Sequence, residues 1–354
     1  RIADTLLDVD GARQRLPNRL RTLITYALVS PEFLYRFERA VPDSEVHPDG
    51  SLPLDDYALA TRLTSFIFSS VPDERLLKVA RNGGLQSEGN IRRQVKKMLA
   101  DPRSRSIAER FAVQWLRIDA VDRLEPDATQ YGEVDIDVLR DMREETILVF
   151  DDVLKEQRPV WDLFRSNDTF LNARLAKHYG IDLPKELYID EDFKKVRTDL
   201  LGYPAAGVGI LAHASILTAT SNPTRTSPVK RGKWVLEALL DSPPPPPPPG
   251  VDQLPPTIDG EDTVSVRIML ERHRADPDCA VCHVRMDAVG LAFESMNGVG
   301  RYRNPDQFGI NETTELPDGS TIDGIFGIAR MLDGNRDVLR SISRHMLVFA
   351  LGRS

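Results

Sequence analysis

The only two cysteines of the 354-residue chain lie three positions apart, and a histidine follows the second one directly. Cys279, Cys282 and His283 thus form a Cys-x-x-Cys-His motif. In this arrangement two thiols add across the two vinyl groups of a haem, and the histidine beside the second thioether ligates the iron. The motif predicts one covalently attached haem c with His283 as the proximal ligand, and a local fold that depends on the cofactor.

Two other sites are built from closely spaced cysteines. A thioredoxin-like dithiol usually lies in a βαβ context and does not require the histidine. A zinc site needs further ligands at matching spacing, and the chain has no second cysteine pair. Haem attachment is therefore the favoured interpretation of the motif.

The hydrophobic pattern predicts a mainly α-helical protein. Apolar residues recur mostly at intervals of three and four, and strand-like alternation of β-branched residues is scarce. Expected helices lie at residues 55–68, 87–100, 104–117, 136–156, 169–178, 230–240, 263–274 and 337–351. Residues 316–324 are rich in turn formers and predict a small hairpin. After the motif, a loop is expected from Met286 to Arg303.

Composition shifts suggest four regions along the chain. Residues 1–200 are expected to form a helical scaffold domain, and 201–262 a connecting segment. That segment holds seven consecutive prolines, Pro243 to Pro249, which favour a stiff polyproline II strut. Residues 263–303 form the predicted cytochrome c-like haem attachment region. The C-terminal hairpin and helix of residues 304–354 are expected to pack on it.

Charge and hydropathy limit the partners. A net charge of −8 argues against nucleic acid, because phosphate binding needs a basic surface. The chain has no run of eighteen apolar residues, so its sequence predicts no transmembrane helix. We expect a signal peptide to be missing from the given chain. Because thioether ligation takes place outside the cytoplasm, the motif predicts a periplasmic or otherwise extracytoplasmic protein.

The sequence leaves the sixth iron ligand open. His273, six residues before Cys279, is the first distal candidate, and His213, alone in an apolar stretch, is the second. Each has an alternative interpretation, a surface or propionate-facing histidine for His273 and a core histidine for His213. Met296 is a weaker candidate, supported only by the length of chain between it and His283, which is enough to reach the opposite face of the haem. Met286 is too close to His283 to reach the opposite face of the ring, and we expect it to pack against the porphyrin.

Several basic and acidic residues bear on the site. Of the arginines near the motif, Arg301 and Arg303 are expected to pair with haem propionates. The others are either solvated or form a docking patch for an acidic redox partner. No pair of carboxylates has a spacing typical of acid–base catalysis, so no catalytic residue is predicted. Glu144 and Glu145 are expected to be solvated on their helix.

The chain resembles the planctomycete-type multi-domain cytochrome c-like family, in which consecutive domains of unknown function surround a single Cys-x-x-Cys-His haem site. The matching stretches follow in order over nearly the whole chain: residues 30–36, 62–66, 169–180, 226–234 with the proline run, 273–287 and 349–353. The family pattern usually has proline after Met286-Asp287, where this chain has Ala288. The resemblance implies a secreted or periplasmic haem protein but no particular reaction.

Three functions are compatible with these features. The first is electron transfer by a monohaem c-type cytochrome that is a subunit or partner of a redox assembly. The second is a haem enzyme of the peroxidase or oxidase type, which requires an open or displaceable sixth ligand position. The third is a structural subunit of a membrane-associated redox complex. A large scaffold for one haem favours binding to a redox protein partner or larger complex.

Overall fold

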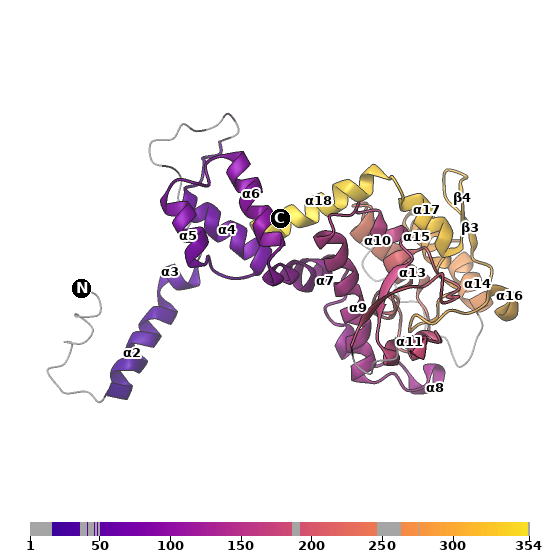
Figure 1. Ribbon diagram of the computed structural model, residues 1–354. Helices are drawn as coiled ribbons and strands as arrows, with labels where there is room; N and C mark the ends of the chain where they lie inside the picture. Colours follow the sequence, from indigo (N-terminus) through magenta and orange to yellow (C-terminus); the bar gives the residue numbers. More distant parts are fainter. Residues whose placement is uncertain are drawn as a thin grey trace. The chain divides into compact units, whose positions relative to one another are not determined.

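The computed structural model describes residues 16–35, 41, 46, 48, 50–185, 192–245, 263–275 and 277–352. Helices dominate these residues, and the strands among them form only two small antiparallel sheets (Figure 1). The prediction of a mainly α-helical protein is therefore confirmed. Residues 246–249 of the proline run and the side chain of His273 lie outside what the structure describes.

Backbone contacts divide the chain into two compact units, one of residues 1–65 and 70–97 and the other of 66–69 and 98–354. Residues 98–200 thus share a unit with the motif, whereas the sequence suggested a boundary near residue 200. The described helices between residues 16 and 99 are α2 (Leu16–Val29), α3 (Pro31–Leu34), α4 (Asp56–Phe68), α5 (Glu74–Arg81) and α6 (Glu88–Leu99).

In the first unit, side-chain caps fix the start of the short helices. Asp73 precedes α5 and accepts a hydrogen bond from the backbone N–H of Leu76 at 3.0 Å. Asp56, at the start of α4, accepts one from the backbone N–H of Leu85 at 2.6 Å, which ties the turn after α5 to α4. The predicted helices at 55–68 and 87–100 are observed within one or two residues.

The second unit is built around α9 (Ile136–Lys155), a 20-residue helix with eleven buried residues. The other described helical elements of this unit are η1 (Pro102–Arg105), η2 (Ala108–Ala112), α7 (Val113–Trp115), η3 (Val121–Arg123), α8 (Ala128–Tyr131), α10 (Asp162–Arg165), α11 (Ala173–Tyr179), η5 (Gly209–Ala212), α12 (Ala214–Ala219), α13 (Pro228–Trp234), η6 (Val235–Leu239), α14 (Thr263–His273), α15 (Pro277–Leu291), α16 (Pro305–Phe308), α17 (Gly324–Leu332) and α18 (Arg336–Leu351). Its strands are β1 (Asp168–Leu171), β2 (Lys194–Arg197), β3 (Thr313–Glu315) and β4 (Thr321–Asp323).

Aromatic side chains join segments that are far apart in the sequence. The ring of Trp115 stacks on Phe111 with centroids 5.9 Å apart and meets Phe150 of α9 edge-on. Its indole N–H donates to the backbone oxygen of Ala238 at 2.7 Å. Because a buried N–H needs an acceptor, this bond fixes η6 against α7.

Two expectations about local structure are wrong. Residues 168–171 form strand β1, paired with β2, and helix α11 begins only after Asn172. Asn172 accepts a hydrogen bond from the backbone N–H of Leu175 and so sets the start of the helix. The loop expected from Met286 is also wrong, because α15 runs on to Leu291. Ala288, a good helix former, stands within that helix.

The hairpin and the last helix are confirmed. Strands β3 and β4 pair in the register Thr314 with Ile322, and the turn between them closes on the backbone bond from Leu316 to Ser320. Helix α18 ends at Gly352, which has the left-handed conformation typical of a glycine C-cap.

Candidate functional site

The Cys-x-x-Cys-His motif lies in the first half of helix α15. Cys279 is the third helical residue, and Cys282 and His283 follow it by three and four positions, so all three side chains share one face of the helix. Both cysteines are half-buried, whereas Val281 between them is 78% exposed. The preceding described element is the helix α14 and not a strand, which disfavours a thioredoxin-like dithiol.

The imidazole of His283 is paired with a buried carboxylate one turn further along α15. Its Nδ1 lies 3.0 Å from Oδ1 of Asp287, whose side chain is fully buried. Since a carboxylate only accepts, the ring nitrogen facing it is the one that carries the proton. In the neutral ring the lone pair is then on Nε2, the tautomer that suits a metal ligand bound through Nε2.

Asp287 has a second charged neighbour. The Nε of Arg274, in the turn after α14, lies 3.8 Å from Oδ2 of Asp287. That oxygen is buried and accepts no hydrogen bond from the residues the structure describes. Asp287 was missed as a site residue by sequence reasoning, although its position four residues after His283 on one helix is a readable signal.

A close helix crossing holds α15 in place. A Cβ added to Gly232 of α13 would lie 1.8 Å from the backbone oxygen of Met286, and one added to Gly290 would lie 1.8 Å from that of Pro228. Both contacts are with backbone, so only glycine fits at either position. Met286 itself is buried at this crossing. Its predicted packing against a porphyrin stays a prediction.

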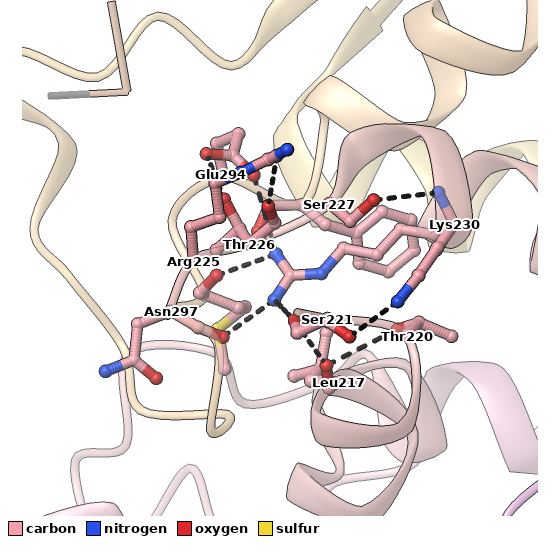
Figure 2. A network of polar contacts seen from close by, with 12 residues as sticks. Leu217, Thr220, Ser221, Arg225, Thr226, Ser227, Lys230, Glu294 and Asn297 are labelled. Carbon is pink, nitrogen blue, oxygen red and sulfur yellow. Dashed lines mark hydrogen bonds and ion pairs between the residues drawn. The ribbon is translucent and has the colours of Figure 1, made fainter. Parts of the chain in front are cut away.

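A buried arginine fastens the segment that follows α15 to α13. The guanidinium of Arg231 donates to the backbone oxygens of Phe293, Met296 and Asn297 at 2.7–2.8 Å and to Ser221 Oγ at 3.2 Å. Figure 2 shows this network of polar contacts, with Ser221 and Asn297 among its labelled members. Burial lowers the pKa of Arg231 to about 10, and the group stays charged at neutral pH.

Glu294 is the counter-charge of this network. It is almost fully buried, lies 3.7 Å from Arg231, and accepts a hydrogen bond from Thr226 Oγ1 at 3.0 Å (Figure 2). Arg303 forms a second ion pair with it at 3.6 Å. Arg303 is therefore paired with a carboxylate of the protein itself, and its predicted pairing with a haem propionate stays a prediction.

Arg301 also donates within the fold. Its Nε and one terminal nitrogen donate to the backbone oxygens of His178 and Tyr131 at 3.1 and 2.6 Å, and the other terminal nitrogen lies 3.3 Å from His178 Nδ1. Met296 is fully buried and pairs with Tyr302 in an isolated β-bridge. Met296, Arg301 and Arg303 all lie in the segment that follows α15, where their contacts are with other parts of the protein. Their predicted roles at a haem stay predictions.

His213 lies in a different cluster, on the side of α9. Its Nδ1 is 2.9 Å from Thr146 Oγ1, and its Nε2 is 3.7 Å from Oε1 of Glu145. Burial lowers the pKa of His213 to about 3, so the ring is neutral at physiological pH. These contacts match the core interpretation of His213, and its role as a distal ligand stays a prediction.

The solvated position expected for Glu145 is wrong. Its carboxylate is buried and accepts hydrogen bonds from Thr169 Oγ1 and Tyr179 Oη, each at 2.6 Å. Burial raises its pKa to about 7. A cavity of about 20 Å³, enough for one water molecule, lies beside Glu145, and the buried hydroxyl of Tyr203, which lines it, has no hydrogen-bond partner among the described residues.

Two stretches of the chain match known protein families. Residues 54–181 match the family described as PSD4, protein of unknown function (DUF1592), and residues 207–306 match PSCyt3, protein of unknown function (DUF1588). The two matched stretches follow one another in the sequence, and both families are planctomycete-type, cytochrome c-associated domains of unknown function. Searches of curated proteins and of solved structures find no similar protein.

The DUF1588 domain contains the motif, and the DUF1592 domain contains Glu145. The DUF1592 match begins in the first compact unit and ends in the second. None of the helices in the described ranges is long and apolar enough to cross a membrane.

The residues of the DUF1588 domain fit a covalently bound haem. Two thiols lie on one helix face beside a histidine whose Nδ1 proton is held by a carboxylate, which is the usual support of a metal-ligating imidazole. A four-ligand zinc site is less well matched, because the described residues hold no cluster of three or more histidine, cysteine, aspartate or glutamate side chains placed to bind a metal.

Proposed function

We propose that the chain binds one haem c through Cys279 and Cys282, with His283 as the proximal ligand, and that it transfers electrons outside the cytoplasm. The observation that supports this most directly is the hydrogen bond of 3.0 Å between His283 Nδ1 and the buried Asp287. A metal-ligating histidine almost always donates its other ring N–H to a carboxylate, a backbone carbonyl or water, and Asp287 is placed to accept it.

A bound haem supplies one-electron redox chemistry at its iron. The chain's own residues anchor and orient it. Cys279 and Cys282 would hold it by two thioethers, and Asp287 orients the His283 ring through Nδ1, the nitrogen that the iron would not use. The crossing of α13 and α15 at Gly232 and Gly290 keeps the helix itself from shifting.

A haem enzyme is the second candidate function, and the same contact favours it. A carboxylate bonded to the proximal imidazole increases electron donation to iron, and an electron-rich axial ligand assists cleavage of the O–O bond. This function also requires an open sixth position.

The electron-transfer proposal includes two further parts. The chain binds a redox protein partner or a larger redox complex, and it is located in the periplasm or elsewhere outside the cytoplasm.

Covalent attachment is tested by expressing the chain with an export signal in a bacterium that carries haem-ligation machinery. We expect a haem-staining band in a denaturing gel for the unaltered chain and for Val281→Ala, which changes the exposed residue between the cysteines. Cys279→Ser with Cys282→Ser should abolish the band. Retained stain in the double variant, or none in the unaltered chain, would contradict the proposal.

Single replacements give a sharper result. Cys279→Ser or Cys282→Ser leaves one thioether and one intact vinyl group, so the pyridine haemochrome band should move to longer wavelength. An unmoved band in either variant would show that this cysteine forms no thioether. Expression without the export signal should give no covalent haem, which tests the location.

Spectra of the purified holoprotein separate the two candidate functions. Electron transfer predicts a six-coordinate, low-spin haem whose absorption does not change with cyanide or peroxide. A high-spin ferric haem that reacts with peroxide would overturn electron transfer in favour of the enzyme.

A further inference from the structure

The carboxylate of Asp287 is buried on the same helix as the proposed iron ligand, with one oxygen bonded to His283 and the other without a hydrogen bond from any described residue. Its side chain is 0% exposed, and the ion pair with Arg274 is longer, at 3.8 Å, than its contact with His283, at 3.0 Å. Burying a carboxylate is costly unless it is paired. Among the described residues, the proximal imidazole is thus the closest partner of this carboxylate.

The hydrogen bond between Asp287 and His283 changes the charge distribution of the imidazole. Positions 283 and 287 are one turn apart, so the helix itself brings the two groups together. In a medium of low dielectric constant a hydrogen bond to an anion is strengthened. The proton stays on Nδ1 but is drawn towards Oδ1, which leaves more negative charge on Nε2.

We propose that Asp287 is a positioning residue that holds His283 in the Nδ1–H tautomer and gives it partial imidazolate character, which favours oxidised over reduced iron. This inference rests on the proposed haem site. Arg274 opposes the effect, because its positive charge competes for the same carboxylate. The two residues together set the balance between ferric and ferrous states.

The first test compares Asp287→Asn with Glu294→Gln in the holoprotein. Both remove a buried carboxylate near α15, but only Asp287 contacts the ring. We expect Asp287→Asn to raise the equilibrium constant for reduction of the iron about tenfold. For a one-electron couple this raises the reduction potential by ~59 mV. Glu294→Gln should change the potential much less. Equal shifts in the two variants would overturn the inference.

A spectroscopic readout tests the bond itself. The stretching frequency of the iron–histidine bond, measured by resonance Raman spectroscopy after photolysis of the carbon monoxide adduct, should fall in Asp287→Asn and stay unchanged in Glu294→Gln. An unchanged frequency in Asp287→Asn would overturn the inference, since a merely structural role does not alter electron donation to iron.

The second test does not disturb the buried carboxylate and applies even if Asp287→Asn fails to fold. Arg274→Gln removes the competing charge, and Arg272→Gln removes the same charge from an exposed neighbour that makes no ion pair with Asp287. We expect Arg274→Gln to lower the potential more than Arg272→Gln does. Equal or opposite shifts would contradict the inference.

These outcomes are distinct from failure of the proposed function. If the unaltered chain takes up no covalent haem, the haem site itself is wrong. If it takes up haem and neither Asp287 nor Arg274 shifts the potential beyond its control, only the role of Asp287 is wrong.

Discussion

At the scale of single residues, three of the buried carboxylates in the second unit differ in their neighbours. Asp287 contacts the His283 imidazole and, at longer range, Arg274, and Glu294 lies beside two arginines. The hydrogen bonds to Glu145 come from the neutral hydroxyls of Thr169 and Tyr179. The surroundings of Glu145 explain why its pKa is the one raised to about 7. Desolvation disfavours its charged form, and two hydroxyl donors only partly restore it.

The raised pKa of Glu145 predicts a pH dependence of stability. Because the folded state binds this proton more tightly than the unfolded chain, the favourable contribution is complete below about pH 4.5 and is lost as the pH rises through about 7. We therefore compare the free energy of unfolding of the unaltered chain with that of Glu145→Gln. The advantage of the unaltered chain should fall by about 3 kcal/mol as the pH rises from 4.5 to about 7. Urea unfolding of both proteins from pH 4 to 8 measures this difference.

A third variant makes the test specific to the carboxylate. Thr169→Val removes a donor that holds the pKa of Glu145 down, so the fall should move to higher pH. A difference that is flat, or that increases with pH, would contradict the buried position of Glu145.

At the scale of elements, the crossing of α13 and α15 positions the motif. Two short glycine contacts bring the backbones together, and the Arg231 network then fastens the turn after α15 to the same helix (Figure 2). Thr314 of β3 donates to the backbone oxygen of Ala288 at 2.8 Å and holds α15 from the hairpin.

We expect Gly290→Ala to lower the free energy of unfolding by about 3 kcal/mol, since its methyl group would overlap the backbone of Pro228 and overpacking typically costs 1–3 kcal/mol or more. Gly89→Ala in α6 is a suitable control, because a Cβ there meets only Ser87 Oγ at 3.9 Å. Its effect should be neutral or slightly stabilising. Equal losses in both variants, measured by urea unfolding, would contradict the crossing.

At the scale of the whole molecule, the chain has two compact units, and the motif belongs to only one of them. Binding energy of a covalent cofactor stabilises the unit that holds it. Local opening of the backbone in that unit should then depend on haem, whereas opening in the unit of residues 1–65 and 70–97 should not.

Amide hydrogen exchange measures this difference. In Cys279→Ser with Cys282→Ser, we expect faster exchange in α15 and in α13 and unchanged exchange in α5. Val281→Ala should match the unaltered chain in all three helices. Equal acceleration of α5 and α15, or no acceleration of either, would contradict the assignment of the cofactor to the second unit.

The sequence alone determined the helical class, most helix positions, the hairpin and the identity of the motif. These features depend on local periodicity, on caps and turn residues, and on spacing within a few positions. The same local reasoning was wrong at residues 168–171, because a four-residue strand is defined by its pairing with β2, 26 positions further along the chain.

Only the tertiary structure decided what surrounds the motif. Burial of Glu145, the partners of Arg301 and Arg303, and the close approach of Gly232 to Met286 all arise between residues distant in the sequence. Asp287 lies between the two cases. Its spacing from His283 is visible in the sequence, but its complete burial, which gives the contact its strength, is a property of the packed helices.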